Sequence, residues 1–251
     1  MLAMIFIYKS IFLLILTAIL PAFAWTNWHP IASINVGAGF SNDAGQSKNF
    51  PILNPITDEF YNYDSDHSTQ TVGLFGGFLG LEHEIKTNLS IQVGLDYTQS
   101  SPFTAKGSFV QGADVASQDT FSYDYSIITR QILAEGKLLY TTHQFFHPYV
   151  TLGLGSSFNK AYNYRTDVPS NLTLTRMYTN NSSTSFSYMA GLGMEVDVHP
   201  HTRLGLSYRF TNLGKTQLGK ANIGGVPVSG TLSQSNFYDN EILLNLIYFI
   251  T

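Results

Sequence analysis

The chain has 251 residues and a formal net charge of −4, and only 12% of its residues are charged while 14% are aromatic. Disorder is excluded, because a disordered chain needs many charges and few aromatic residues. The acidic balance gives no reason to expect a nucleic-acid partner. The absence of cysteine excludes disulfides, thiolate metal sites and cysteine nucleophiles. An exported, low-charge β protein or a membrane protein remains.

The first 24 residues have the pattern of a secretory signal peptide. Lys9 is their only charge, an apolar run covers residues 11–20, and residues 22–24 read Ala-Phe-Ala, the small residues that a signal peptidase needs. We expect cleavage after this triplet, which leaves one domain at residues 25–251. The alternative is an uncleaved membrane anchor, because residues 4–8 extend the apolar stretch toward the ~20 residues of a spanning helix.

The rest of the sequence alternates between apolar residues and polar or small residues with a period of two. In the clearest stretch, Leu192, Met194 and Val196 share one face, while Gly193 and Glu195 lie on the other. This alternation is typical of a strand with one apolar face. We expect eight strands, at residues 32–40, 71–85, 89–98, 130–140, 149–158, 186–198, 203–211 and 238–250.

Short and long connections alternate between these strands. The long ones are rich in Asn, Ser, Thr, Gly, Asp and Pro, and lie at residues 41–70, 99–119, 159–184 and 212–235. The pattern predicts an all-β fold, an eight-stranded antiparallel up-and-down transmembrane β-barrel with short periplasmic turns and four long external loops. Because every backbone polar group in lipid must be paired, such a sheet must close. A soluble secreted β-sandwich is the non-membrane alternative.

Several segments resemble small bacterial outer-membrane β-barrels, of the opacity type and of the transmembrane domain of outer membrane protein A. These segments are Gly-Ala-Gly-Phe (37–40), Gly-Leu-Glu-His (80–83), Leu-Ser-Ile-Gln-Val-Gly-Leu-Asp-Tyr (89–97) and the alternating last strand. The resemblance covers the whole of residues 25–251. It implies a location in the outer membrane, contact with outer-membrane lipids, and the barrel-assembly machinery as a partner during insertion.

The sequence departs from this family in two ways. Family members usually end on Phe or Trp, whereas this chain closes Tyr-Phe-Ile-Thr (248–251). Outer membrane protein A continues into a peptidoglycan-binding domain, and we expect none here, so no wall-anchoring function is inherited. The resemblance specifies an architecture and leaves the function open.

The sequence offers no convincing catalytic, cofactor or metal site. None of the seven histidines is followed two residues later by serine, the spacing of barrel lipases. His199 and His201 flank a proline in a predicted turn, and His143 and His147 also fall in a predicted turn. The acid–histidine cluster at residues 64–67 reads as a solvated loop face. We therefore expect no enzyme activity, no cofactor and no metal.

A group of charged residues is predicted to line the barrel interior. The interior of an eight-stranded barrel is just wide enough for side chains to fill, and an unpaired buried charge costs several kcal/mol. With four acids and four bases, neutral pairing is possible, and we interpret the group as a packed network that plugs the lumen. The alternative is a gated ion path lined by the same residues: Asp96, Arg130, Glu135, Lys137, Glu195, Asp197, Arg203 and Arg209.

Two functions from different classes follow. The first is a monomeric barrel that acts through its exposed loops in surface or host interaction, or in envelope integrity, because far more residues lie in polar loops than closure requires. The second is a narrow porin-like channel for small solutes, because small inward residues such as Gly94, Gly153 and Gly193 would leave voids. A closed barrel has no edge that demands a partner, so a monomer is expected.

Overall fold

The computed structural model describes residues 27–41, 48–51, 60–66, 69–112, 119–142, 145–169, 176–223, 225–228 and 230–250. The predicted signal peptide at residues 1–24 lies outside these ranges. Within them, no helix is long and apolar enough to cross a membrane.

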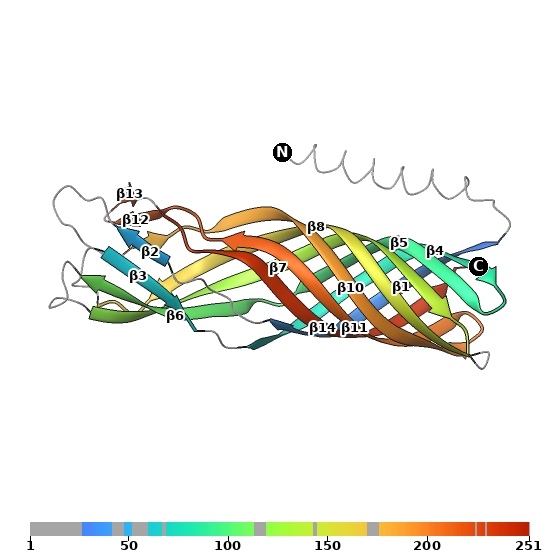
Figure 1. The fold of residues 1–251 in the computed structure, drawn as a ribbon. Coiled ribbons are helices and arrows are strands. Elements are labelled where there is room, and N and C mark those ends of the chain that lie inside the picture. Colours follow the sequence, from blue (N-terminus) through green and yellow to red (C-terminus); the bar gives the residue numbers. More distant parts are fainter. Residues whose placement is uncertain are drawn as a thin grey trace, which may run out of the picture.

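Eight long strands pair side by side in an antiparallel ring, and they slant across its axis (Figure 1). The ring closes because β1 pairs with β14, and β7 pairs with β8 as well as with β5. In ring order the strands are β1 (Trp28–Ser41), β4 (Gln70–Lys86), β5 (Leu89–Ser100), β7 (Asp119–Tyr140), β8 (Phe146–Thr166), β10 (Asn181–His199), β11 (Thr202–Gln217) and β14 (Ser233–Phe249).

The predicted all-β fold is confirmed, and the predicted strand ranges lie within these eight strands, except that Ile250 follows the end of β14. The two faces also match the period-two pattern. Leu95, Leu154 and Leu192 are exposed on the outer face at 59–60%. Polar side chains such as Asn35 and Gln92 are buried inside. An apolar exterior around a polar interior is the arrangement that a lipid environment stabilises.

The short connections, the start of β1 and the end of β14 all lie at the same end of the ring. β4 and β5 are separated only by residues 87–88, and β10 and β11 only by residues 200–201. At this end the Ile250 N–H donates to the Pro30 carbonyl at 2.8 Å, and the Phe249 N–H donates to the His201 carbonyl at 3.0 Å. We call it the turn end.

At the opposite end, the four long connections predicted as loops consist of strands for much of their described length. The ring strands continue, so that residues 159–166, 181–184 and 212–217 belong to β8, β10 and β11. Six shorter strands join them: β2 (Lys48–Pro51), β3 (Phe60–Ser65), β6 (Phe103–Gly112), β9 (Met177–Tyr178), β12 (Ala221–Ile223) and β13 (Val226–Val228). These strands, with the adjoining ends of β7, β8, β10, β11 and β14, form what we call the upper tier.

The upper tier extends the ring wall as long hairpins, seen at the end away from the C-terminus in Figure 1. β6 pairs with β7, β3 with β6, and β2 with β3. The tips of two further hairpins meet where β9 pairs with β12. Among the described residues, β14 pairs with β1 only as far as Asp239, opposite Ser41. The upper tier is therefore not a closed ring in the part of the chain described, and side-chain packing must hold it.

That packing is an aromatic core. Among the described residues, twenty buried ones form one cluster inside the upper tier and the adjacent end of the ring, with Tyr61, Tyr63, Phe109, Tyr123 and Tyr125 among its largest members. Phe109 lies 5.0 Å from Tyr63 and 5.7 Å from Phe121 between ring centroids. The interior therefore changes from polar within the ring to aromatic in the upper tier. Outside lipid, a hairpin array needs a hydrophobic core of its own.

Candidate functional site

Arg203 of β11 lies near the turn end of the ring and contacts three carboxylates. Its Nη1 is 2.7 Å from Glu82 Oε2 and 3.5 Å from Glu195 Oε2, and its Nε is 2.7 Å from Asp197 Oδ1. Gln92 Nε2 donates to the same Glu82 and Glu195 oxygens at 2.7 and 3.2 Å. These side chains come from β4, β5, β10 and β11, so their contacts cross the interior.

Lys137 of β7 lies between two further carboxylates and two aromatic rings. Its Nζ is 3.8 Å from Glu195 Oε1 and 4.0 Å from Glu135 Oε1. The same ammonium lies 4.9 Å from the ring centroid of Phe78 and 5.3 Å from that of Tyr149. An aromatic face attracts a cation, and the attraction is stronger where both are desolvated. This part of the interior is thus filled by packed groups.

A second cluster is centred on Arg209 of β11. Its Nη2 is 2.7 Å from Glu241 Oε2, and its Nη1 is 3.3 Å from Asp96 Oδ2. Thr98 Oγ1 accepts from the Arg209 guanidinium at 3.1 Å and donates to Asp96 at 3.0 Å. Asn35 Nδ2 donates to the other Asp96 oxygen at 3.2 Å. We call the Arg203, Lys137 and Arg209 clusters together the interior network.

Seven of the eight residues predicted to line the interior belong to this network, with Asp197 partly exposed at the turn end. Arg130 does not, and its prediction is wrong. It shares the outer face with Ile132, because residues two apart in a strand point the same way. Arg130 Nε donates to Gln99 Oε1 at 3.2 Å, and the Tyr97 hydroxyl donates to the same oxygen at 2.9 Å.

Two acids of the network were not predicted. Glu82 was missed because the glycines around β4 obscure which of its faces is polar. Glu241 could have been found, because it alternates with the outward Ile242 and Leu244. The expected balance of four acids and four bases is therefore wrong. Three bases face six carboxylates, which are Glu82, Asp96, Glu135, Glu195, Asp197 and Glu241. Neutral amide or hydroxyl donors also bind the first four of these.

The predicted voids are absent at several inward glycines, because side chains already occupy the space above them. A Cβ on Gly193 would lie 2.6 Å from the Tyr149 ring, and one on Gly94 would lie 2.7 Å from Phe78. A Cβ on Gly153 would approach a Leu133 carbon to 3.1 Å. Aromatic packing over glycine stabilises a curved sheet. The inward glycines thus leave space for the side chains that fill the interior of the ring.

His147 lies in β8, and not in a turn as predicted, because β8 begins at Phe146. Its imidazole is buried and is held on both sides. Nε2 lies 3.0 Å from Asp197 Oδ2, and Nδ1 lies 3.0 Å from Thr141 Oγ1. Because Asp197 also binds Arg203, this histidine extends the interior network to the turn end.

The other histidines do not form a recognisable metal centre in the described residues. The rings of His199 and His201 lie 6.2 Å apart at the β10–β11 turn. No group of three or more metal-ligating side chains occurs in the described ranges. His67 and His143 lie outside those ranges. Asp64, a member of the predicted acid–histidine cluster, is exposed in β3.

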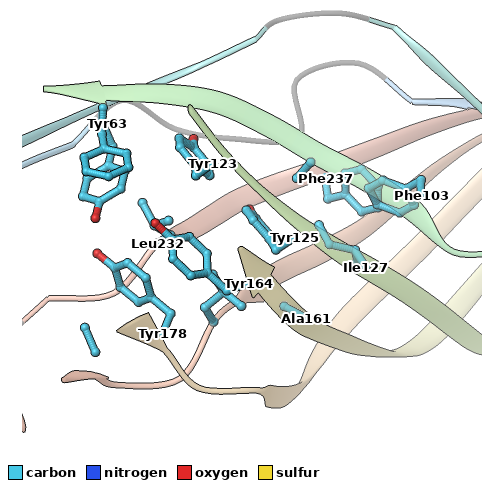
Figure 2. Packing of buried hydrophobic residues seen from close by; sticks show 14 of the residues in the cluster. Tyr63, Phe103, Tyr123, Tyr125, Ile127, Ala161, Tyr164, Tyr178, Leu232 and Phe237 are labelled. Carbon is cyan, nitrogen blue, oxygen red and sulfur yellow. The ribbon is translucent and has the colours of Figure 1, made fainter. Parts of the chain in front are cut away.

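The upper tier gathers the hydroxyl groups of three tyrosines from three strands. Tyr63, Tyr164 and Tyr178 point toward one another in Figure 2. The ring centroids of Tyr164 and Tyr178 are 4.9 Å apart, and those of Tyr63 and Tyr178 are 5.9 Å apart. Burial raises the pKa of each of these tyrosines above its ordinary value. The fully buried Arg176 lies beside them, with its guanidinium 5.2 Å from the Tyr61 ring centroid.

A family model described as an outer membrane protein β-barrel domain matches residues 10–248. The chain belongs to this family. Its place is therefore the outer membrane, and the apolar outer face of the ring is its lipid-facing surface.

A protein of Rickettsia bellii (strain OSU 85-389) named "Putative adhesin" is 24% identical over 185 residues, which are 70% of this chain and 78% of that protein. Among solved structures, the outer membrane protein OprG from Pseudomonas aeruginosa matches 89% of this chain and 98% of its own, with 12% identity and a TM-score of 0.49. The outer membrane protease OmpT from Escherichia coli matches 88% and 97%, with 11% identity and a TM-score of 0.46.

Proposed function

We propose that the protein is a non-enzymatic adhesin of the outer membrane, which presents the upper tier to the exterior and binds a macromolecule on a host cell or another surface. The observation that carries this proposal is the construction of the upper tier. Its hairpins extend well beyond the ring and share a buried aromatic core, which closure of a barrel does not require. A rigid, solvated array of hairpins is suited to present a binding surface.

The proposed orientation follows from the two ends of the ring. Bacterial outer-membrane barrels have short turns on the periplasmic side and longer connections outside. Here the two-residue turns, the start of β1 and the end of β14 lie at one end of the ring, and the upper tier lies at the other. The name of the Rickettsia bellii relative also supports an adhesive role.

The interior network argues against the alternative of a narrow channel. Arg209 reaches across the ring to Asp96, and Arg203 reaches from β11 to Glu82 on β4. These contacts, with the side chains packed over Gly94 and Gly193, fill the path that a solute would take. We therefore assign the network a structural role, as the polar core that holds a narrow barrel together.

A variant without the upper tier tests the proposal. Each hairpin is cut where two residues face each other and is closed with Asn-Gly, which favours a two-residue turn. The four cuts fall at Ser41–Gln70, Gln99–Arg130, Phe158–Thr184 and Asn212–Tyr238. The shortened barrel must still run as a compact band in SDS until it is heated.

Adherence is then measured for cells that carry the full chain, the shortened barrel or neither. We expect adherence only with the full chain. Equal adherence with the shortened barrel would remove the upper tier from the function, and no adherence with the full chain would contradict an adhesin. If the fourfold variant fails to fold, cutting only the β8–β10 hairpin tests the same surface with less disruption.

A further inference from the structure

On the lipid-facing side of the ring, a guanidinium lies at the end of the apolar surface that is nearer to the upper tier. Arg130 of β7 points outward, in register with Phe158 of β8, which is 43% exposed. Phe158 in turn pairs with Thr184 of β10. A cation on the lipid face is costly at the middle of the bilayer, but the cost becomes small near the interface. Its position therefore marks the edge of the apolar band.

Two more cations lie on the same face, just beyond that edge. Lys160 of β8 is exposed two residues past Phe158 and is paired with Ser182 of β10. Lys215 of β11 is also exposed. It lies beside the same stretch of β10, since its backbone N–H donates to Ser185 Oγ at 3.0 Å. β10 separates the two lysine-bearing strands, so their backbones are roughly 10 Å apart, which is two strand spacings.

The residues around these cations are apolar below and hydroxyl-bearing above. Phe186 and Tyr188 of β10 are exposed toward the apolar band, with ring centroids 6.5 Å apart. Thr184 and Ser182 are exposed next along the same strand. We call the surface formed by Arg130, Lys160, Lys215, Ser182 and Thr184 the basic face.

No carboxylate neutralises the basic face from its own strands. Residues 126–130, 156–162, 181–188 and 210–217 are all described by the structure, and none of them is Asp or Glu. The one acid nearby on β7, Asp124, pairs in register with Lys106 and Arg165 farther up the wall. Three uncompensated cations immediately above an aromatic rim form a surface complementary to a row of anionic headgroups.

We propose that the basic face binds the phosphate groups of a phosphorylated glycolipid in the outer leaflet of the outer membrane. The cations would contact its phosphates, the hydroxyls of Ser182 and Thr184 would contact its sugar, and Phe158 and Phe186 would pack against its acyl chains. The upper tier would thereby be fixed at a defined height and tilt above the membrane. The inference rests on the orientation given under the proposed function, but on no particular receptor.

Lipid binding is measured on the full chain in phosphatidylcholine nanodiscs that contain increasing mole fractions of diphosphoryl lipid A, by mass spectrometry of the lipid retained by the protein. The variant R130Q/K160Q/K215Q removes the three cations. The control K86Q/K106Q/K220Q removes three exposed cations elsewhere, so the net charge changes equally. Both variants are first checked for the band shift on heating that reports a folded barrel.

We expect the wild type and the control to share one half-saturating mole fraction, and the R130Q/K160Q/K215Q variant to require at least about tenfold more lipid A, because each cation near a charged surface contributes appreciably. If that triple variant does not fold, K160Q and K215Q singly should each raise the value. An unchanged value would overturn the proposal, and equal retention of phosphatidylglycerol would overturn the assignment to a glycolipid. Since nanodiscs have no inside or outside, a failure here is distinct from a failure of adherence.

Discussion

Arg209 of β11 and Asp96 of β5 stand on opposite sides of the eight-stranded ring, and their side chains meet in its interior, with Nη1 3.3 Å from Oδ2. The contact shows how a narrow barrel uses charge as its core. Asp96 attracts the guanidinium across the interior of the ring. Glu241 binds the same guanidinium from the neighbouring strand β14.

Replacing Arg209 with methionine should lower the free energy of unfolding by about 3–5 kcal/mol, because two buried carboxylates lose their partner. The urea midpoint of the reconstituted protein measures this. The further variant R209M/D96N/E241Q removes the orphaned charges as well and should recover much of the loss. Arg130→Met, on the outer face, is the control. A loss for R209M no larger than that of the control would contradict the structural role of the network.

Two glycines on opposite faces of the wall should respond differently to alanine. A Cβ at Gly193 would press against Tyr149, whereas one at Gly136 meets nothing within 4 Å. We expect Gly193→Ala to destabilise the barrel by about 1–3 kcal/mol and Gly136→Ala to be neutral or slightly stabilising. Urea unfolding compares them. If truncating Tyr149 to alanine does not relieve the Gly193→Ala defect, the packing of that ring over the glycine is not its cause.

The filled interior predicts electrical silence. Folded protein added to a planar bilayer should give no stepwise ion conductance, because the Arg203 and Arg209 clusters and the side chains over the glycines occupy the lumen. The heat-dependent band shift of the same preparation confirms separately that the added protein is folded. Regular conductance steps in the wild type would favour the channel function instead.

The tyrosine cluster predicts a loss of stability at alkaline pH. The pKa values of Tyr63, Tyr164 and Tyr178 are raised by burial. A group whose folded pKa lies above its unfolded value near 10 contributes stability fully below pH 10, and this is lost as pH rises further. Absorbance at 295 nm should show these tyrosines ionising only when the upper tier opens. The triple Tyr→Phe variant should reduce the amplitude of that late phase and leave the part due to Tyr123 and Tyr125, whose pKa values burial also raises. Ionisation of all tyrosines near pH 10 would contradict their burial.

Alternation alone was sufficient to predict the ring. The eight ranges, their lipid-facing sides and the closed architecture all follow from a period of two and from the alternating lengths of the connections. Which charged residues face the interior could not be predicted as accurately. Glu82 lies where glycines remove the contrast between faces. Arg130 was assigned to the interior with the other charged residues, although the period of two places it on the outer face with Ile132.

The upper tier was hidden by its composition. Residues 159–184 are rich in Asn, Ser and Thr, which favours a loop, yet inward Ala161, Tyr164 and Tyr178 belong to a buried core. The spacing of Tyr61 and Tyr63, and of Tyr123 and Tyr125, two residues apart was the available sequence signal for strands with a buried aromatic face. Which tyrosines meet depends on contacts between different hairpins, and no local pattern in one sequence specifies these.

The most direct test of the account asks which end of the barrel faces outward. The chain contains no cysteine, so Lys106→Cys in the upper tier and Thr87→Cys in the β4–β5 turn each provide a single reactive thiol. A membrane-impermeant maleimide applied to intact cells should label K106C and leave T87C unmodified until the outer membrane is permeabilised. Labelling of T87C but not of K106C in intact cells would contradict the account, because the upper tier would then face the periplasm.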